Sequence, residues 1–394
     1  MFCAADAVER GVSVSRGRDI TILASRSGPD ELPTGEPWFS GQGRKAGGMM
    51  HEALCELLGE LLLTHAPTGA EAEIDAWLQA KLQAAGVTPE MDRHGNLVVS
   101  LPGREPGPVT ALAAHKDELA VAVRRIDADG KIWVEPLGGC RPQKYGEGPF
   151  DIVTASGVVE GVLCMGSTHS SALSARTDAA TRRLPEWDVV YIDCGCSGAE
   201  LAERGVHIGD RGVVGRRRKA PLRLGPETLC GYALDDKAGV AIQLLVLDAL
   251  LRQPPRHDTV LAFTCCEESG CSGALYLSYS RPVDDLIAIE IAPIAEEYPV
   301  AFDARPVLMY KDALYHYDLN LTRALAQTAD SCGIAMQSQC VRSFGSDAAV
   351  AKRWGAIGRG ACIAFPTQNT HGFEMGHLGA MQNCVRVLTA YLVS

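Results

Sequence analysis

The stretch VLAFTCCEESG, residues 260–270, decides the fold class because an apolar segment runs directly into two carboxylates and a glycine. Its first five residues are typical of a strand buried in the sheet of an α/β protein. Burying two unpaired carboxylates is costly, and a bound metal ion removes that cost. Because successive strand residues face opposite sides, one of Glu267 and Glu268 can bind a metal ion while the other acts as general base.

Three further apolar segments also lead to a histidine or a carboxylate. These are residues 109–114 before His115, residues 286–289 before Glu290, and residues 361–365 before His371. Each alone is weak, since a lone histidine at a strand end is usually structural. In an open α/β sheet, ligands bind at the carboxyl ends of the strands, so the four segments together predict one site. His377 is a rival to His371, which we prefer because it lies nearer its strand.

The segment ALDDKAG, residues 233–239, opens a helical pattern with two adjacent carboxylates. Aspartate favours the start of a helix, where its side chain caps N–H groups and its charge suits the helix dipole. The other interpretation is that Asp235 lends one oxygen to each of two metal ions. The segment alone leaves both interpretations open.

The domain organisation follows from changes in the sequence pattern. Short β segments separated by turn residues fill the middle of the chain, and helices alternate with apolar strands on either side. We therefore expect a catalytic domain made of residues 49–118 and 225–394, interrupted by a β-rich module at residues 119–224. Residues 1–48, rich in Gly, Ser, Arg and Pro, are expected to be a disordered extension or a misassigned start.

Composition argues against two classes of partner. The 394 residues carry a net charge of -11, and no basic face is evident, which argues against nucleic acid and anionic lipid. We expect the tight basic run at residues 216–219 to be a solvated loop. No apolar stretch reaches the roughly 18 residues that a bilayer-spanning helix needs. The 14 cysteines include no CxxC pair, which indicates free thiols and a cytoplasmic protein.

Four motifs carry a resemblance to a known family. They are AHKDE around His115, ALDDKAG around Asp235, CEESGCSGA around Glu267 and THGFE around His371. Together they resemble the dinuclear metallopeptidases of family 42, the glutamyl and deblocking aminopeptidases that form tetrahedral particles. The resemblance covers about residues 50–394. It implies a phosphorylase/hydrolase-like α/β domain, with a mixed sheet and helices on both faces, interrupted by a barrel-like dimerisation domain.

The resemblance also implies roles for individual residues and two divalent metal ions, zinc or cobalt, with manganese as a third option. His115, Asp235 and Glu290 would bind one ion, and Asp235, Glu268 and His371 would bind the other. Glu267 would be the general base, and Asp117 would orient His115. Gly345, Ser346 and Asp347 match a loop that lies by the substrate in the family. The family usually has Asp at position 290, so this chain departs from it there.

The expected function is removal of N-terminal residues from peptides by a homo-oligomer built from dimers, as large as a dodecamer. His316, between two tyrosines, is a candidate substrate contact. A second interpretation is hydrolysis of a small blocked dipeptide or amide, because IEIAPIAEEYPV at residues 289–300 resembles a bacterial subfamily associated with osmoprotectant dipeptide genes. A third, from another class, is an inactive assembly or binding homologue.

Overall fold

The computed structural model describes residues 46–167, 169 and 184–394. Residues 1–45 of the predicted extension lie outside these ranges, and helix α1 spans Ala46–Leu61. Helix α2 spans Ala72–Ala84 and buries Ile74, Leu78 and Leu82, which lie on one face at helical spacing.

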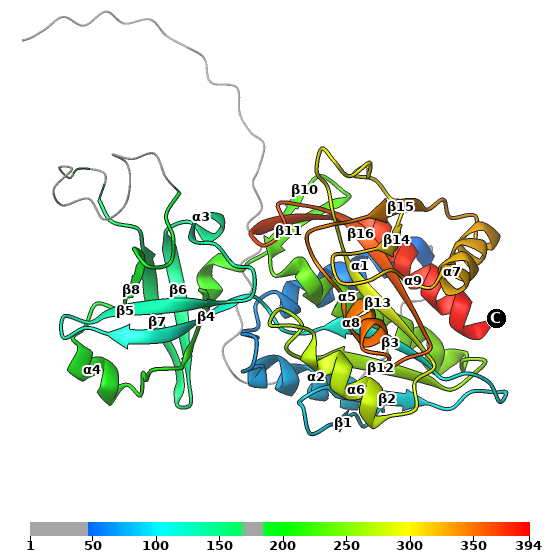
Figure 1. Ribbon diagram of the computed structural model, residues 1–394, viewed down its shortest axis with the longest axis horizontal. Coiled ribbons are helices and arrows are strands. Elements are labelled where there is room, and N and C mark those ends of the chain that lie inside the picture. The colour runs from blue at the N-terminus through cyan, green and yellow to red at the C-terminus, as the bar shows by residue number, and fades with distance from the viewer. Residues whose placement is uncertain (1–45, 168, 170–183) are drawn as a thin grey trace, which may run out of the picture. The chain divides into compact units, whose positions relative to one another are not determined.

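Eleven strands within the described ranges form one mixed sheet (Figure 1). Four neighbouring strands at its centre run parallel, in the order β12, β3, β13 and β16. These span Thr259–Thr264, Thr110–His115, Asp285–Pro293 and Arg359–Gln368. Because parallel neighbours end at the same edge, the four predicted strand ends meet there. The expected α/β class with a mixed sheet is confirmed.

The remaining strands of this sheet flank the parallel centre. They are β1 Glu90–Met91, β2 Leu97–Leu101, β10 Leu222–Leu224, β11 Thr228–Tyr232, β14 Val307–Lys311, β15 Gln337–Cys340 and β17 Phe373–His377. Strands β2, β14 and β17 pair antiparallel with members of the centre, which makes the sheet mixed.

Helices cover both faces of the sheet because β3 sends alternate side chains to opposite sides. Leu112 and Ala114 join a core with the apolar residues of α1, α5 and α9. Ala111 and Ala113 join a second core that also takes residues of α6 and α8. The bounds of the helices not given above are α5 Leu234–Arg252, α6 Ser272–Ser280, α7 Leu319–Ser331, α8 Asp347–Arg353 and α9 Leu378–Val393. The predicted helices on both faces are confirmed.

Six strands between the two parts of this sheet close into a barrel in the order β4, β5, β8, β7, β6, β9. They are β4 Ala120–Ile126, β5 Lys131–Leu137, β6 Gly148–Thr154, β7 Gly157–Cys164, β8 Tyr191–Asp193 and β9 Arg211–Val214, with the short helices α3 Pro142–Tyr145 and α4 Gly198–Glu203 between them. Closure leaves no open sheet edge. The assignment of residues 119–224 to one inserted module stays a proposal, and β10, inside that range, pairs with β11 of the large sheet.

The basic run after the barrel differs from the predicted solvated loop. Arg217 is exposed, but Lys219 is fully buried, and its Nζ donates to Glu118 Oε1 at 2.6 Å. Lys237 Nζ lies 3.3 Å from the same oxygen. Burial alone would raise the pKa of Glu118, but the two ammonium groups lower it to about 2. The prediction is wrong for Lys219 because its partner lies far away in the sequence.

The cysteines within the described ranges are free thiols, as predicted. None of the helices described here combines the length and the apolar character needed to cross a bilayer.

Candidate functional site

The register of the parallel strands brings the predicted residues to one sheet edge. Thr264 at the end of β12 pairs with His115 at the end of β3, and Glu267 and Glu268 follow in the next turn. The pairing of β13 with β3 stops at Ala288, two residues before Glu290. Strand β13 itself continues to Pro293, so the expectation that it ends at Glu290 is wrong. Pairing with β16 carries the strand further.

Asp235 and Asp236 divide the two roles that the sequence leaves open. Both residues have non-helical backbone angles inside the first turn of α5. Asp236 Oδ1 accepts the N–H of Gly239 at 3.0 Å, which is a capping contact. Asp235 instead lies between two imidazoles, with Oδ1 3.1 Å from His115 Nε2 and Oδ2 3.6 Å from His371 Nε2. This geometry favours the interpretation in which Asp235 serves two metal ions.

The structure gathers two groups of metal-ligating side chains around Asp235. In each group one donor atom per residue lies within 4.8 Å of the others. The groups are His115 with Asp235 and Glu290, and Asp235 with Glu268 and His371. They match the two ligand sets that the resemblance implies.

His377 takes no part in either group. Its Nδ1 accepts the N–H of Ala380 at the start of α9, and its ring packs against Phe302. The preference for His371 therefore agrees with the positions of the two rings.

Asp117 holds the turn that carries the two glutamates. Its Oδ1 accepts the N–H of Glu267 at 3.0 Å and its Oδ2 accepts the N–H of Glu268 at 3.2 Å. Its backbone oxygen lies 3.1 Å from His115 Nδ1, closer than its carboxylate at 3.5 Å. Asp117 thus lies closer to His115 through its carbonyl than through its carboxylate, and the carboxylate accepts both N–H groups of the turn, contacts that sequence reasoning missed.

Glu374 is a second residue that sequence reasoning missed. Its Oε2 accepts the N–H of Asp235 at 3.0 Å, and its Oε1 accepts the N–H of His371 at 2.9 Å. It lies in the quoted THGFE motif, which is the signal that could have found it.

The glutamates of the site lie in surroundings that oppose their negative charge. Burial raises the pKa of Glu267 to about 8 and the pKa values of Glu268 and Glu290 well above their ordinary range. Burial opposes protonation of His115, yet hydrogen bonds with Asp117 and Asp235 hold its pKa well above its ordinary value. In the described part of the chain, no lysine or arginine pairs with these three glutamates. Divalent cations would supply the missing charge, and imidazole nitrogens with carboxylate oxygens suit zinc, cobalt or manganese.

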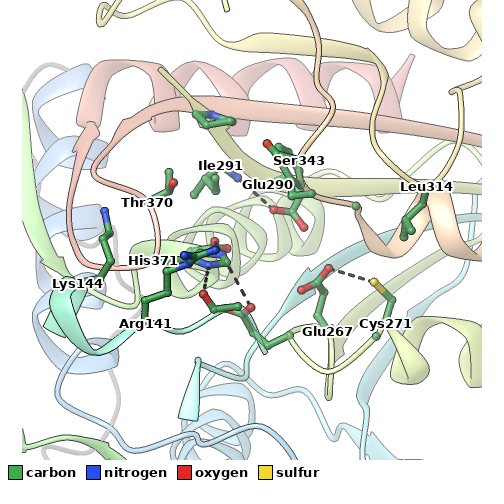
Figure 2. Close-up of a pocket in the computed structure, with 17 residues that line it drawn as sticks. Arg141, Lys144, Glu267, Cys271, Glu290, Ile291, Leu314, Ser343, Thr370 and His371 are labelled. Carbon is green, nitrogen blue, oxygen red and sulfur yellow. Dashed lines mark hydrogen bonds and ion pairs between the residues drawn. The ribbon is translucent and has the colours of Figure 1, made fainter. Parts of the chain in front are cut away.

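A cavity of about 520 Å³ opens onto both groups. Arg141 and Lys144, which follow the barrel strand β5, line it near His371, and Leu314 lies on the other side near Cys271 (Figure 2). Sequence reasoning missed both cations because nothing in the local sequence links them to the distant ligands. Cys271 Sγ lies 3.1 Å from Glu267 Oε1 and donates to it.

The predicted substrate loop reaches this cavity only in part. Gly345 lines it, whereas Ser346 is buried and its hydroxyl contacts Tyr317. Asp347 is also buried and accepts the Thr264 hydroxyl at 2.6 Å. His316 stacks on its neighbour Tyr315 and is absent from the cavity lining.

Comparison with known proteins places these features in context. Residues 95–387 match the family described as M42 glutamyl aminopeptidase. YhfE of Bacillus subtilis (strain 168), named as a candidate aminopeptidase, is 27% identical over 86% of this chain and 97% of its own length. The glutamyl aminopeptidase of Lactococcus lactis subsp. cremoris (strain MG1363) is 25% identical over 59% of this chain and 65% of its own length. The Pyrococcus horikoshii TET1 peptidase, described as assembling into a tetrahedron or a large octahedral shell, shares the fold with a TM-score of 0.77, 24% identity, and coverage of 86% of this chain and 99% of its own.

Proposed function

The chain belongs to the M42 glutamyl aminopeptidase family and is a peptide-bond hydrolase, and we propose that it releases N-terminal residues with two divalent metal ions and Glu267 as general base. The observation that carries the proposal is the position of Asp235, whose two oxygens face His115 and His371. A carboxylate in this position would suit a ligand shared by two divalent ions.

The donor set fits the proposed ions. His115, Asp235 and Glu290 would hold one, and Asp235, Glu268 and His371 would hold the other. When bound, such ions lower the pKa of a water molecule and polarise a carbonyl group.

Glu267 is the proposed proton carrier. It takes a proton from the attacking water and passes it to the leaving amine as the peptide bond breaks. The Cys271 thiol donates to the Glu267 carboxylate, and the Asp117 carboxylate accepts the Glu267 N–H, so both fix the position of Glu267. The bound peptide would lie in the cavity beside Ile291 and Phe344.

The cavity also suggests a substrate preference. Arg141 and Lys144 bring positive charge to a cavity in which Asp235, Glu268 and Glu290 are the proposed metal ligands and Glu267 is the proposed base. We infer that these cations bind the side-chain carboxylate of an acidic N-terminal residue, since charge-assisted hydrogen bonds of this kind are strong.

We also infer that the protein is a homo-oligomer that associates through its barrel. Val158 and Val162 on β7 are 42% and 44% exposed, and their spacing puts them on the same side of the strand. The TET1 peptidase, which shares the fold, is described as able to assemble into a tetrahedron or a large octahedral shell. The free thiols of the described cysteines fit a reducing compartment, so a cytoplasmic location stays our proposal.

One experiment tests the proposed reaction. Protein reconstituted with zinc, cobalt or manganese is assayed on free aminoacyl peptides and on N-acylated peptides and amides, with Glu267→Gln as the matched variant. We expect hydrolysis of free N-terminal substrates only, and Glu267→Gln should keep its metal content but lose turnover. Activity confined to blocked substrates, or an active Glu267→Gln variant, would contradict the proposal. Failure to bind any metal would favour an inactive homologue.

A further inference from the structure

A second kind of donor cluster lies beside the turn that carries Glu267. Within this thiol cluster, formed by His94, Cys265 and Cys266, one donor atom per residue lies within 4.8 Å of the others. Two sulfurs and an imidazole make it chemically unlike the carboxylate-rich groups around Asp235. None of its residues belongs to those two groups.

The backbone explains why two adjacent cysteines turn toward each other. Neighbouring residues of a strand point to opposite faces, which would separate the sulfurs. Strand β12 ends at Thr264, however, and Cys266 adopts a left-handed conformation with φ of 55°. Non-glycine residues occupy this region uncommonly. As a result the two sulfurs lie within 4.8 Å of each other.

The third donor, His94, is held in place from two sides. Its Nε2 lies 2.9 Å from Ser272 Oγ, and its ring stacks on Tyr276 with 5.4 Å between the ring centroids. When Nε2 donates this hydrogen bond, Nδ1 carries the lone pair that a metal ion needs. Histidine ligands are typically fixed by such an outer hydrogen bond.

The cluster is also open to solvent on one side and close to a carboxylate. His94 is exposed, Cys266 is half-buried and Cys265 is buried. Glu71 Oε1 lies 3.6 Å from Cys266 Sγ and can accept a proton that leaves the thiol. An ion can therefore enter from solvent and replace the thiol protons.

We propose that His94, Cys265 and Cys266 form a binding site for a thiophilic divalent cation of the zinc and cadmium type, and that occupation of this site slows peptide hydrolysis. Thiolate with imidazole is the donor set that such cations prefer. Sulfur ligands lie about 2.3 Å from zinc, so donor atoms within 4.8 Å of one another can reach a common ion with small adjustments.

The effect on hydrolysis arises because the thiol cluster adjoins Glu267 in the chain, and it rests on the proposed function. Cys266 directly precedes Glu267, whose N–H is fixed by Asp117. An ion that draws the two sulfurs together moves this turn and displaces the general base from its position. A misplacement of about 1 Å can cost roughly 100-fold in rate.

Cadmium binding tests the site directly. The metal-loaded protein is titrated with Cd²⁺ while the ultraviolet sulfur-to-cadmium charge-transfer absorbance is recorded, a signal that carboxylate and imidazole ligands do not give. The absorbance of wild type should rise as one equivalent of Cd²⁺ binds tightly. The Cys265→Ser/Cys266→Ser variant should not show this rise. The matched control is Cys194→Ser/Cys196→Ser, which removes another closely spaced thiol pair and should keep the signal. Ser272→Ala should weaken binding about tenfold by freeing the His94 ring.

The outcomes separate the parts of the proposal. An unchanged absorbance in Cys265→Ser/Cys266→Ser overturns the site, as does the finding that the two cysteines of the native protein form a disulfide. Cadmium inhibition that persists in this variant overturns the effect on hydrolysis. If metal-loaded wild type hydrolyses no peptide, the proposed function and this effect fail, while the absorbance titration still decides the site.

Discussion

Glu374 fixes the backbone of His371, because its Oε1 accepts the His371 N–H at 2.9 Å. Its other oxygen accepts the N–H of Asp235, so one buried carboxylate sets the positions of two proposed ligands. Burial raises the pKa of Glu374 to about 8, which shows how much its environment opposes the charge. Metal ions beside Asp235 would offset that opposition.

The first prediction concerns this positioning role. In Glu374→Gln one of the two acceptor oxygens becomes an amide donor, so either Asp235 or His371 loses its backbone hydrogen bond. We expect metal affinity to fall about 10–100-fold, as for other outer partners of metal ligands, with the fold unchanged. Calorimetric titration with zinc measures this, and Glu296→Gln, at an exposed glutamate, is the control. Equal affinity in the two variants would refute the role.

The second prediction concerns Glu118, which is buried between Lys219 and Lys237. Glu118→Gln leaves two ammonium groups buried without their partner, which should cost about 3–5 kcal/mol of unfolding free energy at neutral pH. Urea unfolding measures the loss. Glu160→Gln is the matched control, because its exposed pair with Arg217 is worth at most about 1 kcal/mol.

The pH dependence of that difference has a defined sign. The folded pKa of Glu118 is about 2, below its ordinary value of 4.5, so its contribution is complete above pH 4.5. As the pH falls from 4.5 to 2, the difference between wild type and Glu118→Gln should shrink. A difference that is constant or grows over this interval would contradict the paired state of Glu118.

The third prediction concerns the cations of the cavity. Arg141→Met and Lys144→Met should each raise KM roughly tenfold or more for peptides that begin with Glu, because charge-assisted hydrogen bonds are worth about 1.5–3 kcal/mol. KM for peptides that begin with Leu should stay near the wild-type value. Steady-state kinetics on the two substrates provide the comparison, with Lys131→Met on the barrel as control. A parallel change for both substrates would argue for a general structural effect.

The fourth prediction concerns the exposed valines of β7. Val158→Asp/Val162→Asp places two charges on the proposed contact face, which should shift the protein to smaller species in analytical ultracentrifugation. Leu251→Asp changes an equally exposed apolar residue on α5 and should leave the mass unaltered. If both variants sediment like wild type, the contact lies elsewhere.

The central sheet was predictable because its signals are local. Apolar runs that end in metal-ligating residues indicate both a buried strand and the edge at which it stops. The position of His115 at the end of β3 could be predicted from such a run, whereas the role of Asp235 stays a proposal that rests on its motif and its contacts. The C-terminal end of β13 could not be predicted from its apolar run, because pairing with β16 carries the strand past Glu290.

Contacts between distant segments explain what the sequence did not reveal. The partner of Lys219 is Glu118, 101 residues earlier, so a basic run looked like a solvated loop. Arg141 and Lys144 likewise reach the cavity only because of how the chain after β5 lies against the site. The sequence around Arg141 and Lys144 contains no pattern that indicates a position in the cavity.

The buried contacts around Lys219 also bear on how substrate selectivity can change. Lys219, after β9, donates to Glu118, which follows β3, and Asp151 on β6 hydrogen-bonds His65, which follows α1, so buried polar contacts join the barrel to segments beside the large sheet. Arg141 and Lys144 line the cavity from the connection between β5 and β6 of this barrel. Substitutions in this connection can therefore change which peptides bind in the cavity, while the residues proposed to carry out hydrolysis stay the same.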